Sequence, residues 1–186
     1  MKKFLALLLA VMMLSVAAFA LAEEAGFDEY ELGVEGEQDV DFMTMSMVYF
    51  QPVDMAPAEN ATPKEGSDLH IEVDLTANEN PYSFPVDGWV PYLSIDFVIK
   101  DTDSNEVYSG SMMPMAASDG PHYGANIKLP EADTYNITFT IHSPEDMNYL
   151  IHSDAETGPG GVLSDYFANG PLTVTYEGWD YTPQEW

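Results

Sequence analysis

The stretch Leu69-His70-Ile71-Glu72-Val73-Asp74-Leu75 alternates strictly between apolar and polar side chains. Successive residues of a β-strand point to opposite faces, so the four apolar residues face one way and His70, Glu72 and Asp74 face the other. The pattern predicts a strand with one face in a hydrophobic core. Its polar face carries an imidazole and two carboxylates, side chains that bind metals.

Similar short runs follow along the chain, separated by turn residues. They cover residues 45–53, 69–75, 93–99, 106–112, 122–129, 135–141 and 172–176. The longer connections 78–89 and 143–161 are rich in proline and glycine and are predicted to be loops. Several short strands at regular spacing favour an all-β fold, an antiparallel β-sandwich of immunoglobulin-like (Ig-like) architecture. Because the chain has no cysteine, it lacks the Cys…Trp…Cys signature of antibody domains.

The N-terminus has the pattern of a secretory signal peptide. Lys2 and Lys3 precede an apolar run, and Ala20-Leu21-Ala22 offers small residues for cleavage before Glu23. The run is too short and wrongly flanked for a membrane-spanning helix. We therefore expect a signal peptide at 1–22, an acidic leader or edge strand at 23–41 and an Ig-like metal-binding domain at 42–186.

The charge of the chain is strongly negative. It has 5 lysines, no arginine and 32 acidic residues, for a formal net charge of −27. Removal of residues 1–22 would take two lysines and no acid, leaving 164 residues with a formal charge of −29. Such a surface repels nucleic acid and anionic lipid and attracts cations. We therefore expect no nucleic-acid partner and no membrane insertion after cleavage, although acidity by itself also serves solubility.

His70 and Glu72 form the first pair of candidate ligands. They are two residues apart on one strand, so their side chains leave the same face with Cα atoms roughly 6.5 Å apart. Metal–ligand bonds of about 2 Å let both side chains reach one ion. The competing interpretation is a solvent-exposed polar strand face, where histidine and glutamate are common.

A second element is the run from Met112 to Gly124, which contains Met-Met-Pro-Met and ends in Gly-Pro-His-Tyr-Gly. Residues 118–121 form a turn sequence that brings Met115 and His122 together from either side. A thioether is a soft ligand, and it favours copper over magnesium or calcium. Met112 and Met113 are expected to fill the core, because the strand leads inward there.

The third imidazole is left open by spacing alone. His142 and His152 both qualify, with Glu145 or Asp154 available to fix the ring tautomer of the nearer histidine. A minor second-site candidate is a strand face with three methionines, more typical of a half-buried strand: Met43, Met45 and Met47.

These motifs resemble the bacterial periplasmic Fe2+ transport protein family, from about residue 30 to residue 176. The segments that carry the resemblance are 48–55, 70–74, 88–93, 113–128 and 152–158, and the Met-Pro-Met…Ser-Asp-Gly-Pro-His block is the most specific. The resemblance implies a homodimeric Ig-like sandwich that binds copper and iron beside an Ftr-type iron permease. It places the family's metal ligands on His70, Glu72, Met115, His122 and His152, and so selects His152 over His142.

Together these observations predict a soluble periplasmic or otherwise extracytoplasmic protein that binds copper and iron and assists high-affinity iron uptake. A carrier is favoured over an enzyme. Two alternatives stay open: a periplasmic redox enzyme acting on iron or copper, and a structural Ig-like surface module with incidental histidines.

Overall fold

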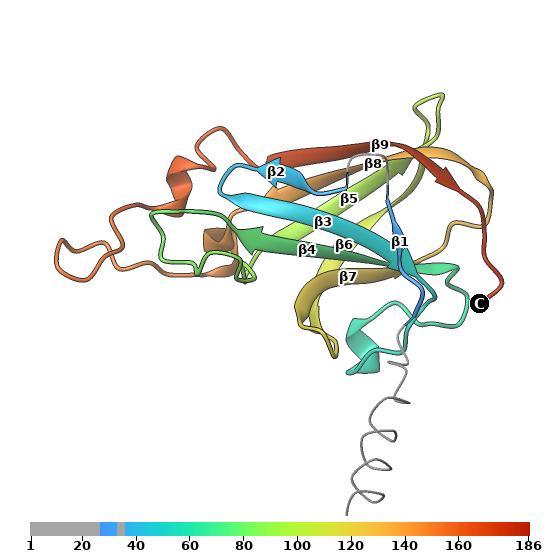
Figure 1. Ribbon diagram of the computed structural model, residues 1–186, viewed down its shortest axis with the longest axis horizontal. Helices are drawn as coiled ribbons and strands as arrows, with labels where there is room; N and C mark the ends of the chain where they lie inside the picture. The colour runs from blue at the N-terminus through green and yellow to red at the C-terminus, as the bar shows by residue number, and fades with distance from the viewer. Residues whose placement is uncertain (1–26, 33–35) are drawn as a thin grey trace, which may run out of the picture.

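The computed structural model describes residues 27–32 and 36–186. These residues form nine β-strands, all paired antiparallel (Figure 1). The strands are β1 (Tyr30–Glu31), β2 (Gln38–Val40), β3 (Met43–Phe50), β4 (Leu69–Ala77), β5 (Ser94–Lys100), β6 (Glu106–Ala116), β7 (Pro121–Ile127), β8 (Asp133–His142) and β9 (Leu172–Tyr181). Three short 3-10 helices are η1 (Ala58–Asn60), η2 (Pro144–Met147) and η3 (Leu163–Asp165). The predicted all-β antiparallel fold is confirmed, whereas its Ig-like classification stays a prediction. The predicted signal peptide lies outside the described residues.

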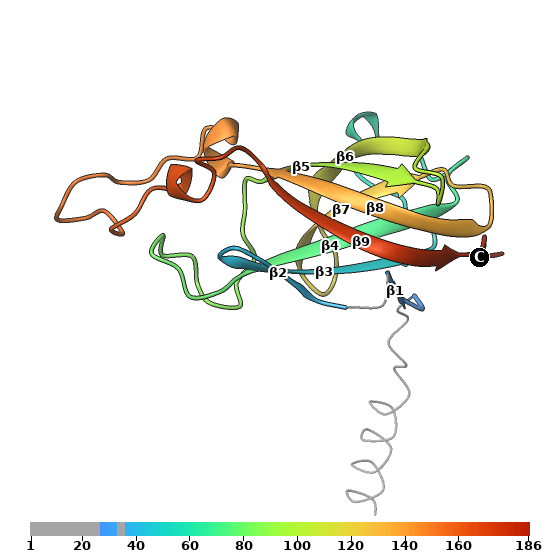
Figure 2. The same ribbon diagram turned by 90° about the horizontal axis from the view of Figure 1, so that it is seen from above.

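The strands follow the order β1-β3-β4-β7-β6-β5-β8-β9, with β2 also paired to β3. Strand β6 joins the two halves, because Met112 pairs with Ile95 of β5 and Met113 pairs with Gly124 of β7. The sheet is strongly curled, and its two edges approach each other where β2 contacts β9 (Figure 2). The curl gives the sheet an enclosed inner face and an outer face.

The inner face holds the hydrophobic core. The four apolar residues of the β4 alternation are completely buried, as their spacing predicted. Met43, Met45 and Met47 also belong to this core, with exposed fractions of 4 % or less. These three methionines are therefore packing residues, and the second-site candidate is wrong for them.

The described part of the acidic leader pairs with the sheet. β1 and β2 both lie along β3, with Tyr30 opposite Tyr49 and Gln38 opposite Met45. Leu32 is fully buried in the core. Residues N-terminal to position 42 thus contribute an edge to the sandwich.

Two pairs of connections are important for the site. The β3–β4 connection, which contains η1, and the β6–β7 hairpin both line one cavity beside the β4–β7 pair. The β4–β5 and β8–β9 connections project from one end of the sandwich, green and orange in Figures 1 and 2. Aromatic contacts hold those two loops together, such as Phe84 against Tyr149 and Tyr92 against Tyr149.

Candidate metal centre

The outer face of β4 carries two polar side chains that are nearly inaccessible to solvent. His70 is 1 % exposed and Glu72 is 6 % exposed. Antiparallel pairing sets His70 opposite Asn126 and Glu72 opposite Gly124, so these four residues share one face of the β4–β7 pair. The interpretation of a solvent-exposed polar face therefore does not hold, and the burial of these groups requires a specific cause.

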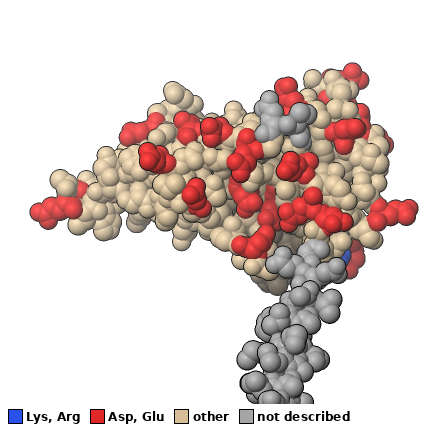
Figure 3. Space-filling view, viewed as in Figure 1, with Lys and Arg blue, Asp and Glu red and all other residues tan. Residues whose placement is uncertain are grey.

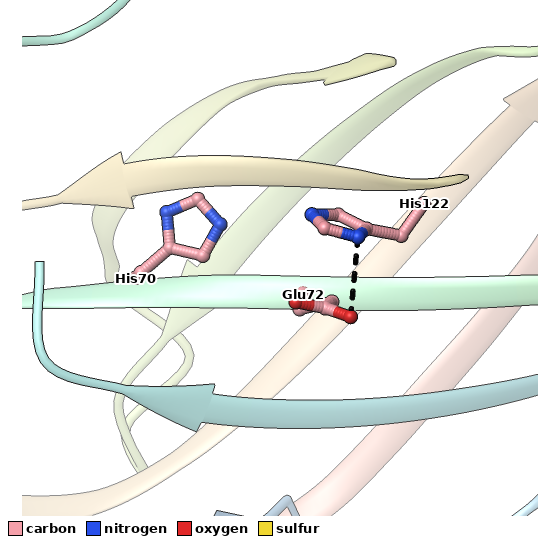
Figure 4. A group of neighbouring side chains, drawn as sticks. All are labelled: His70, Glu72 and His122. Carbon is pink, nitrogen blue, oxygen red and sulfur yellow. Dashed lines mark ion pairs between the residues drawn. The ribbon is translucent and has the colours of Figure 1, made fainter. Parts of the chain in front are cut away.

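His122, on β7, completes a compact group of three donors. One ligand atom each of His70, Glu72 and His122 lies within 4.8 Å of the others, and all three residues are buried. Nδ1 of His122 is 3.3 Å from Oε1 of Glu72. Figure 4 shows the two imidazoles facing one another, with the carboxyl group beside His122. One ion with bonds of about 2 Å could contact all three side chains.

Asn126 fixes the orientation of the His70 ring. Its Nδ2 donates to the carbonyl oxygens of Val53 (2.8 Å) and Thr62 (3.0 Å), which leaves Oδ1 to accept from the backbone N–H of Val53 and from Nδ1 of His70 (2.9 Å). A ring that donates from Nδ1 presents a lone pair at Nε2. That Nε2 atom is buried and has no hydrogen-bond partner among the described residues. A buried, unpaired imidazole nitrogen with its tautomer fixed by a neighbour is the usual arrangement of a metal ligand.

Gly124 leaves the space in front of this nitrogen free. A Cβ atom at this position would lie 2.5 Å from Nε2 of His70 and 3.1 Å from Cε of Met115. The end of the Met115 thioether and the His70 nitrogen thus border the same small volume. Met115 also pairs directly with His122 across β6 and β7. The residues present therefore fit a metal ion that prefers imidazole and thioether ligands, such as copper.

Burial keeps the three donors uncharged at neutral pH. Desolvation lowers the pKa of His70 to about 4 and raises the pKa of Glu72 to about 8, the latter helped by the charges of Asp74, Asp119 and Glu29. Desolvation also lowers the pKa of His122, and the charge of Asp74 opposes this shift. The contact between His122 and Glu72 is then between neutral groups rather than an ion pair. Metal binding at neutral pH would displace the Glu72 proton.

A cavity of about 860 Å³ opens in front of the three donors. Its walls come from the N-terminal segment, the β3–β4 loop and the β6–β7 hairpin, and they include Glu29, Asp54, Asp119 and one lysine, Lys64. Figure 3 shows acidic side chains across the visible face of the molecule. The negative field of this surface favours the approach of cations.

The other two histidines lie elsewhere. His152 is exposed in the β8–β9 loop, where its Nδ1 lies 2.9 Å from Oγ1 of Thr157, which in turn donates to Asp154. Nε2 of His142 lies 3.1 Å from Oδ2 of Asp96 rather than near Glu145. Neither histidine lines the cavity. Within one chain the structure brings together four of the five predicted ligands: His70, Glu72, Met115 and His122. The assignment of His152 as the fifth ligand stays a prediction.

Sequence reasoning missed Asn126 and Gly124, and it misplaced Met113. Every second residue of β7 points to the same face, as His122, Gly124 and Asn126 do. The sequence could therefore have predicted this shared face from the position of His122. Met113 is 45 % exposed and lines the cavity, whereas Met112 is buried. The expectation that both fill the core was wrong for Met113, because neighbouring residues of a strand point to opposite faces.

An antiparallel β-sandwich with buried imidazole and carboxyl donors, bordered by a partly buried thioether, defines a candidate metal-binding protein of the all-β class. The comparisons with known proteins agree. The model of the family described as "Fe2+ transport protein" matches residues 26–183. The "34 kDa membrane antigen" of Treponema pallidum (strain Nichols) is 38 % identical over 179 residues, which cover 94 % of this chain and 85 % of that protein.

Two solved structures are also similar. FetP of uropathogenic Escherichia coli strain F11, produced in the periplasm of E. coli, has 36 % identity and a TM-score of 0.75, covering 86 % of this chain and 100 % of its own. Copper-reconstituted P19 of Campylobacter jejuni has 34 % identity and a TM-score of 0.75, covering 86 % of this chain and 99 % of its own. The chain belongs to the Fe2+ transport protein family, and the resemblance noted in its sequence is confirmed.

Proposed function

We propose that this protein is an extracytoplasmic carrier that binds copper and iron and assists high-affinity iron uptake by an Ftr-type permease. The observation that carries the proposal is the buried Nε2 of His70, which Asn126 orients beside His122 and Glu72 and which has no hydrogen-bond partner in the described part of the chain. A buried nitrogen without a partner is costly in a protein that binds nothing there. A bound cation would give it a partner.

Two kinds of likeness support the choice of metals. FetP and P19, which share the fold and about a third of their residues with this chain, have copper-bound structures. The family itself is one of iron transport. The donor set also suits copper, because imidazoles and a thioether accept both Cu(I) and Cu(II). The proposals that the protein also carries iron and that the permease receives it rest on the family resemblance.

The location outside the cytoplasm rests on the N-terminal sequence pattern, together with the periplasmic production of FetP. Among the described residues, no helix is both long and apolar enough to cross a membrane.

The fifth ligand, His152, is proposed to come from a second copy of the chain. Its loop projects from one end of the sandwich, beside the β4–β5 loop (Figures 1 and 2), and His152 does not line the cavity of its own chain. That end also exposes large apolar side chains: Val86, Tyr92, Met147 and Leu150, the last of them 87 % exposed. Exposed apolar side chains of this kind favour association. A homodimer that covers them could place His152 of one copy at the centre of the other.

Copper titration tests the proposal. Isothermal titration of the mature chain with Cu²⁺ should give tight binding at His70 and His122. Replacing both by alanine should weaken it at least about 100-fold, since outer partners of metal ligands alone contribute about 10- to 100-fold. The matched control is His142→Ala, a half-buried histidine outside the cavity, which should bind like the wild type. Unchanged affinity in the double variant would favour the structural module with incidental histidines.

The same protein distinguishes a carrier from a redox enzyme. Copper-loaded protein mixed with excess Fe²⁺ in air should bind iron stoichiometrically and then stop. Sustained catalytic oxidation of iron, dependent on His70 and His122, would instead support the enzyme alternative.

A further inference from the structure

The cavity holds thioethers that the ligand set does not use. Met113, expected in the core, is 45 % exposed and lines the cavity. It lies two residues before Met115 on β6, so both side chains leave the same face with Cα atoms roughly 6.5 Å apart. A side chain that is half exposed beside the candidate metal centre contributes little to the core, so core packing does not explain its position.

The sheet register places Met113 next to the centre. Met113 pairs with Gly124, and Gly124 pairs on its other side with Glu72. Because glycine has no side chain, nothing on β7 separates the β6 thioethers from the donors of β4 at this level. Met115 already reaches this gap, since its Cε is close to the position that a Gly124 Cβ would occupy.

A third thioether faces the cavity from another wall. Met55 lies in the β3–β4 loop, is partly buried and lines the same cavity as Met113 and Met115. Its position is restrained, because both the N–H and the carbonyl of nearby Val53 are hydrogen-bonded to Asn126. The asparagine that orients His70 thus also holds the loop that presents Met55.

Thioethers are neutral and soft, and they bind monovalent copper far better than borderline Fe²⁺ or hard cations. We propose that Met55 and Met113 form a second, sulfur-based site for Cu(I) on the cavity side of the histidine centre, with Met115 lying between the two sites. The site takes a soft monovalent cation of the Cu(I) or Ag(I) class. No proton is displaced on binding, because a thioether has none to lose.

Silver provides the test, because Ag⁺ is soft and monovalent like Cu(I) but does not oxidise in air. The mature chain, labelled at its methionine methyl groups with ¹³C, is titrated with Ag⁺ and followed by NMR and native mass spectrometry. We expect the methyl signals of Met55 and Met113 to shift and two silver ions to bind per chain. Met113→Leu should retain one ion and weaken the other at least about tenfold. Leucine keeps the apolar surface and removes only the sulfur.

Met147→Leu is the matched control, because Met147 is 51 % exposed but lies outside the cavity. It should bind both silver ions as the wild type does. Shifts confined to Met115, or two ions bound equally tightly by Met113→Leu, would overturn the proposal.

The second site and the proposed function can fail separately. Met113→Leu should leave the Cu(II) spectrum unchanged, because Met113 is not among the ligands of the histidine centre. A wild-type chain that binds no Cu(II) while Ag⁺ still shifts Met55 and Met113 would refute the proposed function and support the sulfur site. Normal Cu(II) binding without any silver response at Met55 and Met113 would refute the sulfur site alone.

Discussion

His70 and His152 occupy opposite ends of the sandwich and differ in what surrounds them. His70 lies on a strand and is 1 % exposed; Asn126 holds one ring nitrogen, and the other has no hydrogen-bond partner within residues 27–32 and 36–186. His152 stands on an exposed loop and is held by Thr157. Strand register places His70 at the centre, whereas His152 does not line the cavity and joins the centre in the proposed homodimer. Changes at the two ends should therefore have different sizes and different dependence on protein concentration.

Filling the gap at Gly124 should have the largest effect. Gly124→Ala places a methyl group 2.5 Å from Nε2 of His70, so the ring must leave its position. We expect the Cu²⁺ affinity measured by titration to fall by about 100-fold or more. Gly120→Ala in the same hairpin is the matched control, because its added Cβ would contact nothing within 4 Å. Equal affinities of the two variants would show that the space before Nε2 is not the binding position.

Removing the Asn126 amide should come next. Asn126→Leu deprives Nδ1 of His70 of its acceptor and leaves the backbone groups of Val53 and Thr62 without partners. We expect copper affinity to fall about 10- to 100-fold. The apo protein should also lose stability, because each lost hydrogen bond to the part-buried Val53 and Thr62 groups contributes about 1 kcal/mol. Nitrogen-15 NMR of the His70 ring should report a mixture of tautomers. A ring that still carries its proton solely on Nδ1 would contradict the role given to Asn126.

His152→Ala should have a smaller effect that depends on protein concentration. If a second copy supplies this ligand, copper affinity should fall about tenfold where dimers form and should match the wild type where the chain is monomeric. Sedimentation at several concentrations, with and without Cu²⁺, measures the assembly alongside the titrations. His142→Ala, which removes a histidine held by Asp96 and outside the cavity, is the control and should match the wild type at every concentration. Loss of affinity that is the same at every concentration would mean that the imidazole acts within its own chain.

The smallest effect should be the pH dependence of the apo protein. Glu72 has a pKa of about 8 against an ordinary 4.5, so the folded chain holds a proton that the unfolded chain releases, and stability falls as pH rises across this interval. His70, with its pKa of about 4 against 6.5, acts oppositely below pH 6.5.

Between pH 6.5 and 8 the Glu72 contribution is therefore no longer opposed by His70. The free energy of unfolding should drop there by at most about 2 kcal/mol. Glu72→Gln cannot titrate and should show a flatter profile in urea denaturation. Parallel profiles for the two proteins would mean that Glu72 is ionised in the folded state.

The sequence predicted the inward face of β4 and the shared face of His70 and Glu72, because a period of two is a local property. It did not predict that this outer face is covered. The cover comes from residues in other parts of the chain, such as Val53 and Thr62, which hydrogen-bond to the same Asn126 that holds His70. Local periodicity carries no information about such tertiary contacts. The exposure of Met113, by contrast, could have been predicted locally. Strand alternation places it on the face opposite to the buried Met112.

The four hydrogen bonds of Asn126 link the β3–β4 loop to the imidazole of His70. The amide fastens the loop at Val53 and Thr62 and at the same time holds the ring of His70. Peeling the loop from the sheet would therefore also free the imidazole to rotate. Displacing the β3–β4 loop would therefore lower the affinity for a bound ion. A docking protein that moves this loop would release the ion without a change of pH.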